Sequence, residues 1–194
     1  MIDLHFQVQG ETIQVDHGYA LFSAISSCLG KEFHHEKRAD VRLALIRGRY
    51  AGDGLLKLLP SSRITLRLPL EKVALYINLA GKTLDLVGHK VRVGVPKSQR
   101  VMPATVLYAH LVTTKSGLER KRFEKEIRRQ LDEQGCHGRV FVGKRRTFSI
   151  HGKKIVGYSL LVSELSAEES LVLQEKGVGG RGRMGCGFFY PWTG

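Results

Sequence analysis

Glycine and arginine alternate near the end of the chain in a pattern suited to binding phosphate groups. Between residues 177 and 187, six of the eleven positions are glycine and two are arginine. Glycines let a backbone approach a phosphate chain closely and offer bare amides as donors, and arginine presents a fork of donors that fits phosphate oxygens. We predict that this loop cradles phosphates; a flexible connection is the alternative. Its candidate residues are Gly177, Gly179, Gly180, Arg181, Gly182, Arg183, Gly185 and Gly187.

The same loop matches the pattern G-x-G-x-x-G at residues 177–182. That pattern binds dinucleotides when it follows a strand and opens a helix. Here the apolar spacing places it after a helix and before a strand, so it lacks the helix N-terminus that would receive a pyrophosphate. We therefore expect no dinucleotide site, and the sequence predicts no cofactor.

A second group of basic residues lies in a predicted two-stranded ribbon. Residues 140–150 and 155–162 have the pattern of two strands, joined by residues 151–154 with a turn glycine. Such a ribbon can contact phosphates along an RNA groove, where A-form geometry makes recognition mostly a matter of shape and backbone. The alternative is a solvated strand surface. The cations concerned are Lys144, Arg145, Arg146, Lys153 and Lys154.

The overall charge agrees with a polyanionic partner. The chain has 31 Lys and Arg against 18 Asp and Glu, a formal net charge of +13. Nucleic acid is favoured over an anionic membrane surface as the partner. The longest apolar runs are far shorter than the roughly 20 residues that cross a bilayer, and the N-terminus has no secretory pattern. We expect a cytoplasmic protein with no membrane partner.

Two adjacent histidines offer acid–base chemistry. His34 and His35 precede Glu36 in a polar stretch after the first predicted helix. A metal ion is one interpretation, but no Cys, Asp or third His lies at ligand spacing, and we predict no metal site. The other interpretations are a solvated loop and acid–base catalysis, for which the ordinary histidine pKa of about 6.5 is well placed.

The elements that must position these residues occur in the same order in both halves of the chain. Residues 97–194 predict a strand (105–113), a helix (118–134), the two ribbon strands, a helix capped at Ser166 and a final strand (186–190). Residues 1–96 repeat this order less regularly, and a linker is expected between Pro96 and Pro103. We predict an α+β protein of two tandem ferredoxin-like (βαββαβ) units, 1–96 and 97–194, with a C-terminal glycine-rich loop.

Several segments resemble one known family. Residues 173–189 (LQEKGVGGRGRMGCGFF) resemble the C-terminal glycine-rich motif of the RAMP superfamily, and residues 16–26 (DHGYALFSAIS), 103–109 (PATVLYA) and 170–175 (SLVLQE) are similar to the same family. Within it, the chain is most similar to the MYXAN-subtype form of the CRISPR-associated endoribonuclease that processes repeat-containing precursor RNA. The resemblance covers nearly the whole chain.

The resemblance implies two ferredoxin-like units and metal-independent cleavage of a CRISPR repeat. The family's short His-Glu pattern falls on His35 and Glu36 in this sequence, and His34, His17 and Tyr19 are further catalytic candidates. One position departs from the family, because Ala44 stands where the MYXAN-type sequences lead us to expect a histidine.

Two functions follow as expectations. The first is an endoribonuclease that cuts repeat RNA by 2′-hydroxyl attack, leaves a 2′,3′-cyclic phosphate and stays bound to the guide RNA with other subunits of a type I surveillance complex. The second is a non-catalytic RNA-binding subunit of the same fold, which Ala44 favours. A phosphate-metabolite enzyme is disfavoured by the misplaced glycine pattern.

Overall fold

The structure is a computed structural model that describes residues 1–30, 33, 41–115 and 117–192. The chain divides into two compact units, Met1–Arg100 (unit 1) and Val101–Gly194 (unit 2), and each is described by itself. The boundary follows Arg100 rather than residue 96. Strand β8 (His89–Arg100) continues through Pro96, which pairs with β1 on one side, whereas β7 pairs with β8 only as far as Arg92. Proline is tolerated there because the other side of the strand needs no donor.

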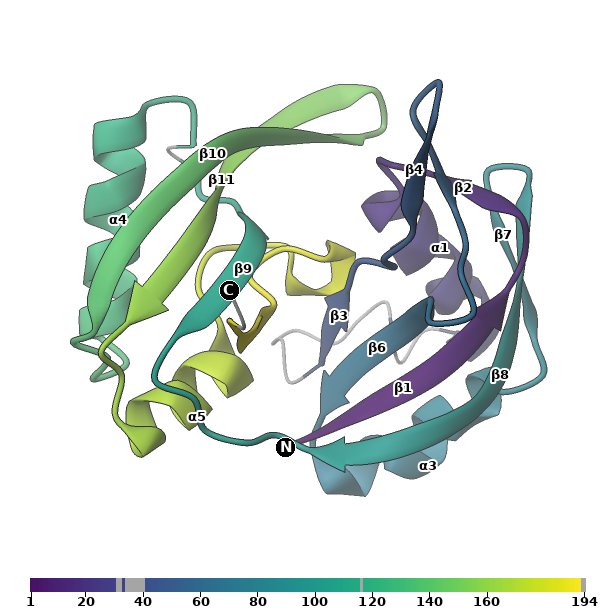
Figure 1. The fold of residues 1–194 in the computed structure, drawn as a ribbon, viewed down its shortest axis with the longest axis horizontal. Coiled ribbons are helices and arrows are strands. Elements are labelled where there is room, and N and C mark those ends of the chain that lie inside the picture. The colour runs from purple at the N-terminus through teal and green to yellow at the C-terminus, as the bar shows by residue number, and fades with distance from the viewer. Residues whose placement is uncertain (31–32, 34–40, 116, 193–194) are drawn as a thin grey trace. The chain divides into compact units, whose positions relative to one another are not determined.

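Unit 1 contains a five-stranded antiparallel sheet in the order β3-β6-β1-β8-β7 among its described residues. The sheet strands are β1 (Ile2–Gln9), β3 (Arg42–Ala44), β6 (Arg63–Leu68), β7 (Thr83–Leu86) and β8. The helical segments are α1 (Gly18–Leu29), η1 (Leu70–Lys72), α3 (Val73–Tyr76) and η2 (Ile77–Leu79). With β7 set aside as an addition, β1, α1, β3, β6, α3 and β8 follow the predicted ferredoxin-like order (Figure 1).

A small second sheet in unit 1 was not predicted. It pairs β2 (Thr12–Gln14), β5 (Leu55–Lys57) and β4 (Arg49–Gly52). Strands of three or four residues are too short to show an alternation of apolar and polar side chains, so the sequence pattern gave no signal for them.

Unit 2 has the four-stranded antiparallel order β10-β11-β9-β12 (Figure 1). Its elements are β9 (Leu107–Val112), α4 (Arg120–Asp132), β10 (Arg139–Ile150), β11 (Lys153–Ser163), α5 (Ala167–Lys176), η3 (Gly182–Met184) and β12 (Phe189–Pro191). This is the predicted strand-helix-strand-strand-helix-strand order. The capping box at the start of α5 is also confirmed: Ser166 Oγ accepts from the Glu169 N–H, and the Glu169 carboxylate accepts from the Ser166 N–H.

The last strand begins later than predicted. The pattern predicted strand 186–190, but Gly185 and Gly187 have φ of 86° and 63°, and the strand starts only at Phe189. Positive φ is incompatible with extended pairing, so these residues belong to the loop.

Each helix of unit 2 packs on one face of its sheet. Phe123, Ile127 and Leu131 of α4 and Leu173 of α5 are fully buried against Leu160 and its neighbours on the strands. We call this the helix face of unit 2 and the other side its second face. Among the described residues, no helix is long and apolar enough to cross a membrane.

Candidate nucleic-acid interface

Charges in unit 2 are separated by element. Nine acidic residues occur in 101–194. Glu164 directly follows β11 and pairs with Arg139 at 3.5 Å. The other eight lie on α4 or α5 or next to them: Glu119, Glu124, Glu126, Asp132, Glu133, Glu168, Glu169 and Glu175. Residues 139–163 and 177–192, which make up the ribbon and the loop with the last strand, contain none. They contain eight cations instead: Arg139, Lys144, Arg145, Arg146, Lys153, Lys154, Arg181 and Arg183. The strands and loop therefore present positive charge to a polyanion.

The arginines of α4 pair with carboxylates on the helix and at its two ends. Arg120 pairs with Glu124 at 2.9 Å, and Arg129 pairs with Glu126 at 2.7 Å. Hydrogen bonds from Arg129 and Gln130 lower the pKa of Glu126 to about 2, so this carboxylate stays ionised. The outer face of α4 is thus balanced in charge, and the excess positive charge of unit 2 belongs to its strands and loop.

The ribbon strands place their cations on two different faces. His151 and Gly152 both have positive φ, 47° and 75°, which is the geometry of a tight hairpin turn. Because side chains alternate along β10, Arg146 lies on the second face with Phe148, whereas Arg145 lies opposite Tyr158 on the helix face. By the same pairing, Lys153 shares the face of Arg146 and Lys154 that of Arg145. The sequence prediction had treated these cations as one group.

The glycine-rich loop is fastened to the sheet by its own backbone. The Gly180 and Gly187 N–H groups donate to the Thr113 and Leu111 carbonyls at 2.9 and 2.7 Å. The Gly179 N–H donates to Gln130 Oε1 at 2.7 Å. The prediction of bare amides is therefore wrong for Gly179, Gly180 and Gly187, whose donors are used inside the unit. The alternative of a flexible connection is equally unsuited to a loop held in this way.

Two neighbouring glycines show what the loop requires. Gly179 has φ of 78°, and a Cβ there would lie 2.4 Å from the Thr113 carbonyl oxygen. Gly180 has neither constraint, since its Cβ would meet nothing within 4 Å. Gly179 is therefore needed for close packing, whereas Gly180 lies open at the surface.

The loop covers part of the second face of unit 2. Cys186 is buried with Leu111 and Phe148, and Met184 packs against this group. Arg146 shares this face, and its Nε atom is buried with no hydrogen-bond partner among the described residues. Arg181, held at a φ of 64°, keeps its side chain exposed. Arg146 and Arg181 are therefore the candidate side chains near the loop for binding phosphate oxygens.

The candidate catalytic residues lie in unit 1. His34 and His35 are outside the described residues. Tyr19 lies half-buried in the first turn of α1, with its ring 6.3 Å from that of Phe22. His17 is 1% exposed, so burial lowers its pKa.

Both ring nitrogens of His17 are occupied. Nδ1–H donates to the Gln14 carbonyl at 2.8 Å, and Nε2 accepts from the Ile46 N–H at 3.0 Å. A neutral, buried imidazole with two backbone partners has no nitrogen left for proton transfer, and this geometry gives His17 a structural role rather than the catalytic one predicted.

Ala44 lies on a polar face of the unit 1 sheet. It pairs with Thr65, which pairs with His5 on the next strand. Thr65 Oγ1 lies 2.9 Å from His5 Nδ1, and Gln99 Oε1 lies 3.2 Å from Nε2. Burial is the largest cause of the lowered pKa of His5. An imidazole in place of Ala44 would therefore lie on the face that already holds His5.

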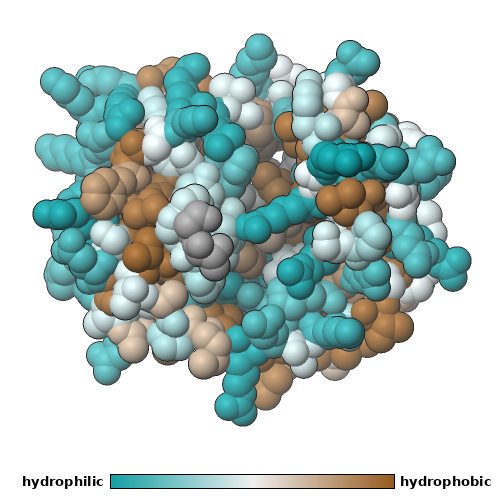
Figure 2. All heavy atoms as spheres, in the orientation of Figure 1, coloured by the Kyte–Doolittle hydropathy of each residue, from teal (hydrophilic) through white to brown (hydrophobic). Residues whose placement is uncertain are grey.

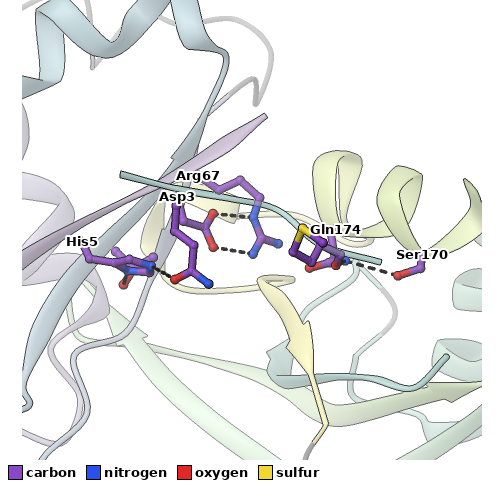
Figure 3. Close-up of polar contacts among 8 residues, drawn as sticks. Asp3, His5, Arg67, Ser170 and Gln174 are labelled. Carbon is purple, nitrogen blue, oxygen red and sulfur yellow. Dashed lines mark hydrogen bonds and ion pairs between the residues drawn. The ribbon is translucent and has the colours of Figure 1, made fainter. Parts of the chain in front are cut away.

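The next row on this face holds a buried ion pair (Figure 3). Arg67 is 2% exposed and donates two hydrogen bonds to the Asp3 carboxylate. Nε donates to Oδ1 at 2.7 Å, and Nη2 donates to Oδ2 at 2.8 Å. Arg42 lies opposite Arg67 on β3, and burial together with the Arg67 charge lowers its pKa to about 10. The sequence did not predict this network. Alternation along a strand shows which side chains share a face, but it does not show which strands pair with one another.

Fold and charge together define the class: a tandem ferredoxin-like protein whose second unit concentrates positive charge on its strands and loop. The family model described as "Cas6 Crispr" matches residues 2–194. The chain therefore belongs to the Cas6 family.

Known relatives agree with this assignment. The CRISPR-associated endonuclease Cas6 of Myxococcus xanthus (strain DK1622) is 39% identical over 190 residues, which cover 98% of this chain and 81% of that protein. A solved structure described as an RAMP protein binding different RNA substrates has a TM-score of 0.71 at 13% identity, over 97% of this chain and 98% of the other. The product of a Cas6-related gene from Pyrococcus furiosus gives 0.68 at 14%, over 99% and 98%. At such identities these two structures show a shared fold.

Proposed function

We propose that this chain is an endoribonuclease that binds CRISPR repeat RNA in precursor transcripts and cleaves it to give guide RNA. The observation that carries the proposal is the 39% identity to a CRISPR-associated endonuclease along almost the whole chain. The charge separation in unit 2 supports it, because an extended polyanion is the partner that such a surface suits. The chain acts in the cytoplasm and keeps the guide RNA within a type I surveillance complex.

The proposed reaction needs no redox step or cofactor. A base takes the proton of the 2′-hydroxyl, whose oxygen then bonds to the adjacent phosphorus while the bond to the 5′-oxygen breaks. An acid gives that oxygen a proton, so the products are a 2′,3′-cyclic phosphate and a 5′-hydroxyl. Positive side chains stabilise the charge that gathers on the phosphate oxygens.

We assign the acid–base role to His35, with His34 and Tyr19 as further candidates in the same unit. Histidine suits either proton role near neutral pH because its ordinary pKa is about 6.5. In unit 2, Arg146, Lys153 and Arg181 contact backbone phosphates, and recognition is mostly of RNA shape.

The test uses the repeat RNA incubated with the full chain in EDTA. Cleavage is expected to proceed, and a single 2′-deoxy substitution at the cut site should abolish it because the nucleophile is removed. His35→Ala should slow cleavage by about 10²–10⁴-fold with binding nearly unchanged. A fully active His35→Ala variant would remove His35 from the mechanism.

A second candidate function, RNA binding without cleavage, is favoured by Ala44. If the chain binds repeat RNA but does not cut it, Ala44→His is the decisive substitution, because it places an imidazole beside Thr65 and His5. Recovered cleavage would identify Ala44 as the position of the lost base. Continued inactivity with tight binding would establish the non-catalytic subunit.

A further inference from the structure

The second face of unit 2 carries a row of apolar and aromatic side chains that crosses all four strands. Phe141 pairs with Leu161, Leu161 with Tyr108, and Tyr108 with Tyr190. Residues paired in this way lie side by side on one face of the sheet. Trp192 follows Tyr190 by two residues and therefore points to the same side.

The row is held in place and remains accessible. The Trp192 N–H donates to the Val106 carbonyl at 3.0 Å, which fixes the backbone beyond β12. Its ring lies 5.0 Å from that of Tyr108, which also contacts Tyr190 at 5.8 Å. Phe141 and Trp192, at the two ends, are 49% and 46% exposed. Figure 2 shows a hydrophobic patch over β10 and β11, surrounded by hydrophilic side chains.

The glycine-rich loop divides the second face into two parts. The end of the sheet near Phe148 is covered by Cys186 and Met184. The row from Phe141 to Trp192 belongs to the other part. The loop therefore covers the cluster at Phe148, whereas Phe141 and Trp192, at the two ends of the aromatic row, stay exposed to solvent.

Charge indicates what covers the row. The strands and loop around it contain eight cations and no acidic residue. Such a surface attracts an extended polyanion more strongly than it attracts a neutral or weakly acidic protein. Unpaired nucleobases are the polyanion's apolar surfaces, and they stack on aromatic rings whatever their sequence. Four strands at about 4.8 Å spacing give a row about 14 Å long, which is enough for the two or three bases that such sheets accommodate.

We propose that Phe141, Tyr108, Tyr190 and Trp192 form a stacking platform for unpaired nucleotides of a single-stranded RNA segment. The platform deepens the proposed function and rests on it, because it specifies that the bound RNA includes a single-stranded part beside its duplex. Phosphates on either side of the stacked bases reach the cations of the strands and loop.

The chain supplies its own probe, since Trp192 is its only tryptophan. Full chain is titrated with an oligoadenylate of about ten nucleotides and with a ribose-phosphate strand of equal length that lacks bases. Base stacking should quench the Trp192 fluorescence with the first strand only, and the abasic strand should bind at least tenfold more weakly. Equal affinity for both strands would overturn the platform.

Substitutions locate the effect. Phe141→Ala and Trp192→Ala should each weaken oligoadenylate binding about tenfold, whereas Trp192→Phe should retain most of it because the ring remains. Leu171→Ala is the matched control, an exposed apolar side chain on α5, and should leave affinity unchanged. Both alanine variants melt at the wild-type temperature if the row has no structural role. Wild-type affinity in both would overturn the proposal.

Cleavage of the repeat RNA separates the two proposals. A chain that cuts repeat RNA but whose alanine variants bind oligoadenylate like wild type keeps the proposed function and loses the platform. A chain whose Trp192 is quenched by oligoadenylate but that neither binds nor cuts repeat RNA keeps the platform and loses the proposed function.

Discussion

The two units share one strand order but differ in what they place on the sheet. On the polar face of unit 1, Asp3 is gripped by Arg67, and His5 lies between Thr65 and Gln99. In unit 2, the ribbon and loop bear cations with no acidic residue among them. The same topology therefore supports a face whose polar groups satisfy one another in unit 1 and a surface that attracts an external polyanion in unit 2.

This difference separates stability from binding. Charges that pair inside a protein stabilise the fold, and removing one partner leaves the other buried and uncompensated. Exposed cations on segments that contain no carboxylate contribute little to the fold and can bind a ligand. Substitutions in unit 1 should therefore change the free energy of unfolding, and those on the unit 2 strands should change RNA affinity.

The largest effect is expected at the buried ion pair. Asp3→Ala removes the carboxylate that neutralises Arg67, and should lower the free energy of unfolding by about 3–5 kcal/mol. Urea unfolding of the full chain measures this. Glu124→Ala, which removes one exposed ion-pair partner on α4, is the control and should change stability little. A loss as small as that of the control would mean that the polar face does not stabilise unit 1.

The next largest effect should separate the two neighbouring loop glycines. Gly179→Ala introduces a Cβ against the Thr113 carbonyl at a positive φ, and should destabilise the chain by about 2–4 kcal/mol. Gly180→Ala meets no atom within 4 Å and should leave the unfolding transition in place. Similar unfolding transitions for the two variants would contradict the packing of the loop on β9.

The two units also differ in how much of their secondary structure can be predicted from the sequence. In unit 2, long alternating strands, an amphipathic helix at Phe123, Ile127 and Leu131 and the capping box at Ser166 are local patterns, so the element order could be predicted. In unit 1, β7 and the small sheet were missed because their strands span only three or four residues. Short strands are specified by long-range pairing, which a single sequence does not show.

The sequence predicts which residues belong to the candidate site but not which groups they contact. The glycine loop and its arginines were found from composition alone. The Gly179 N–H donates to Gln130 and the Gly180 N–H to Thr113, and these bonds depend on tertiary packing. The two hydrogen bonds of the His17 ring depend on it in the same way. The aromatic row gave no signal because Phe141, Leu161, Tyr108 and Tyr190 come from four separate strands.

Histidine burial should make the pH dependence of stability a property of unit 1. Burial lowers the pKa of His17 and His5 below the usual 6.5, whereas His137 in unit 2 is exposed. At these two histidines the unfolded chain takes up protons at a higher pH than the folded chain, so their contribution to stability is full above about pH 6.5 and declines below it. The free energy of unfolding should fall by about 1 kcal/mol between pH 7.5 and 5.5 because of His17, which is 1% exposed. His17→Gln should flatten this slope.

The smallest effect concerns single cations and is read from salt dependence rather than from affinity alone. Each phosphate contact releases counterions, so the slope of log affinity against log salt counts contacts. Arg146→Gln should lower that slope by about 1 and weaken repeat RNA binding modestly, because one proposed phosphate contact is lost. Arg122→Gln is the matched control, since Arg122 pairs with Glu119 on the balanced surface of α4. If both variants lower the slope equally, RNA also tracks the helix, and the division of unit 2 into a balanced helix side and a cationic strand side does not describe its binding.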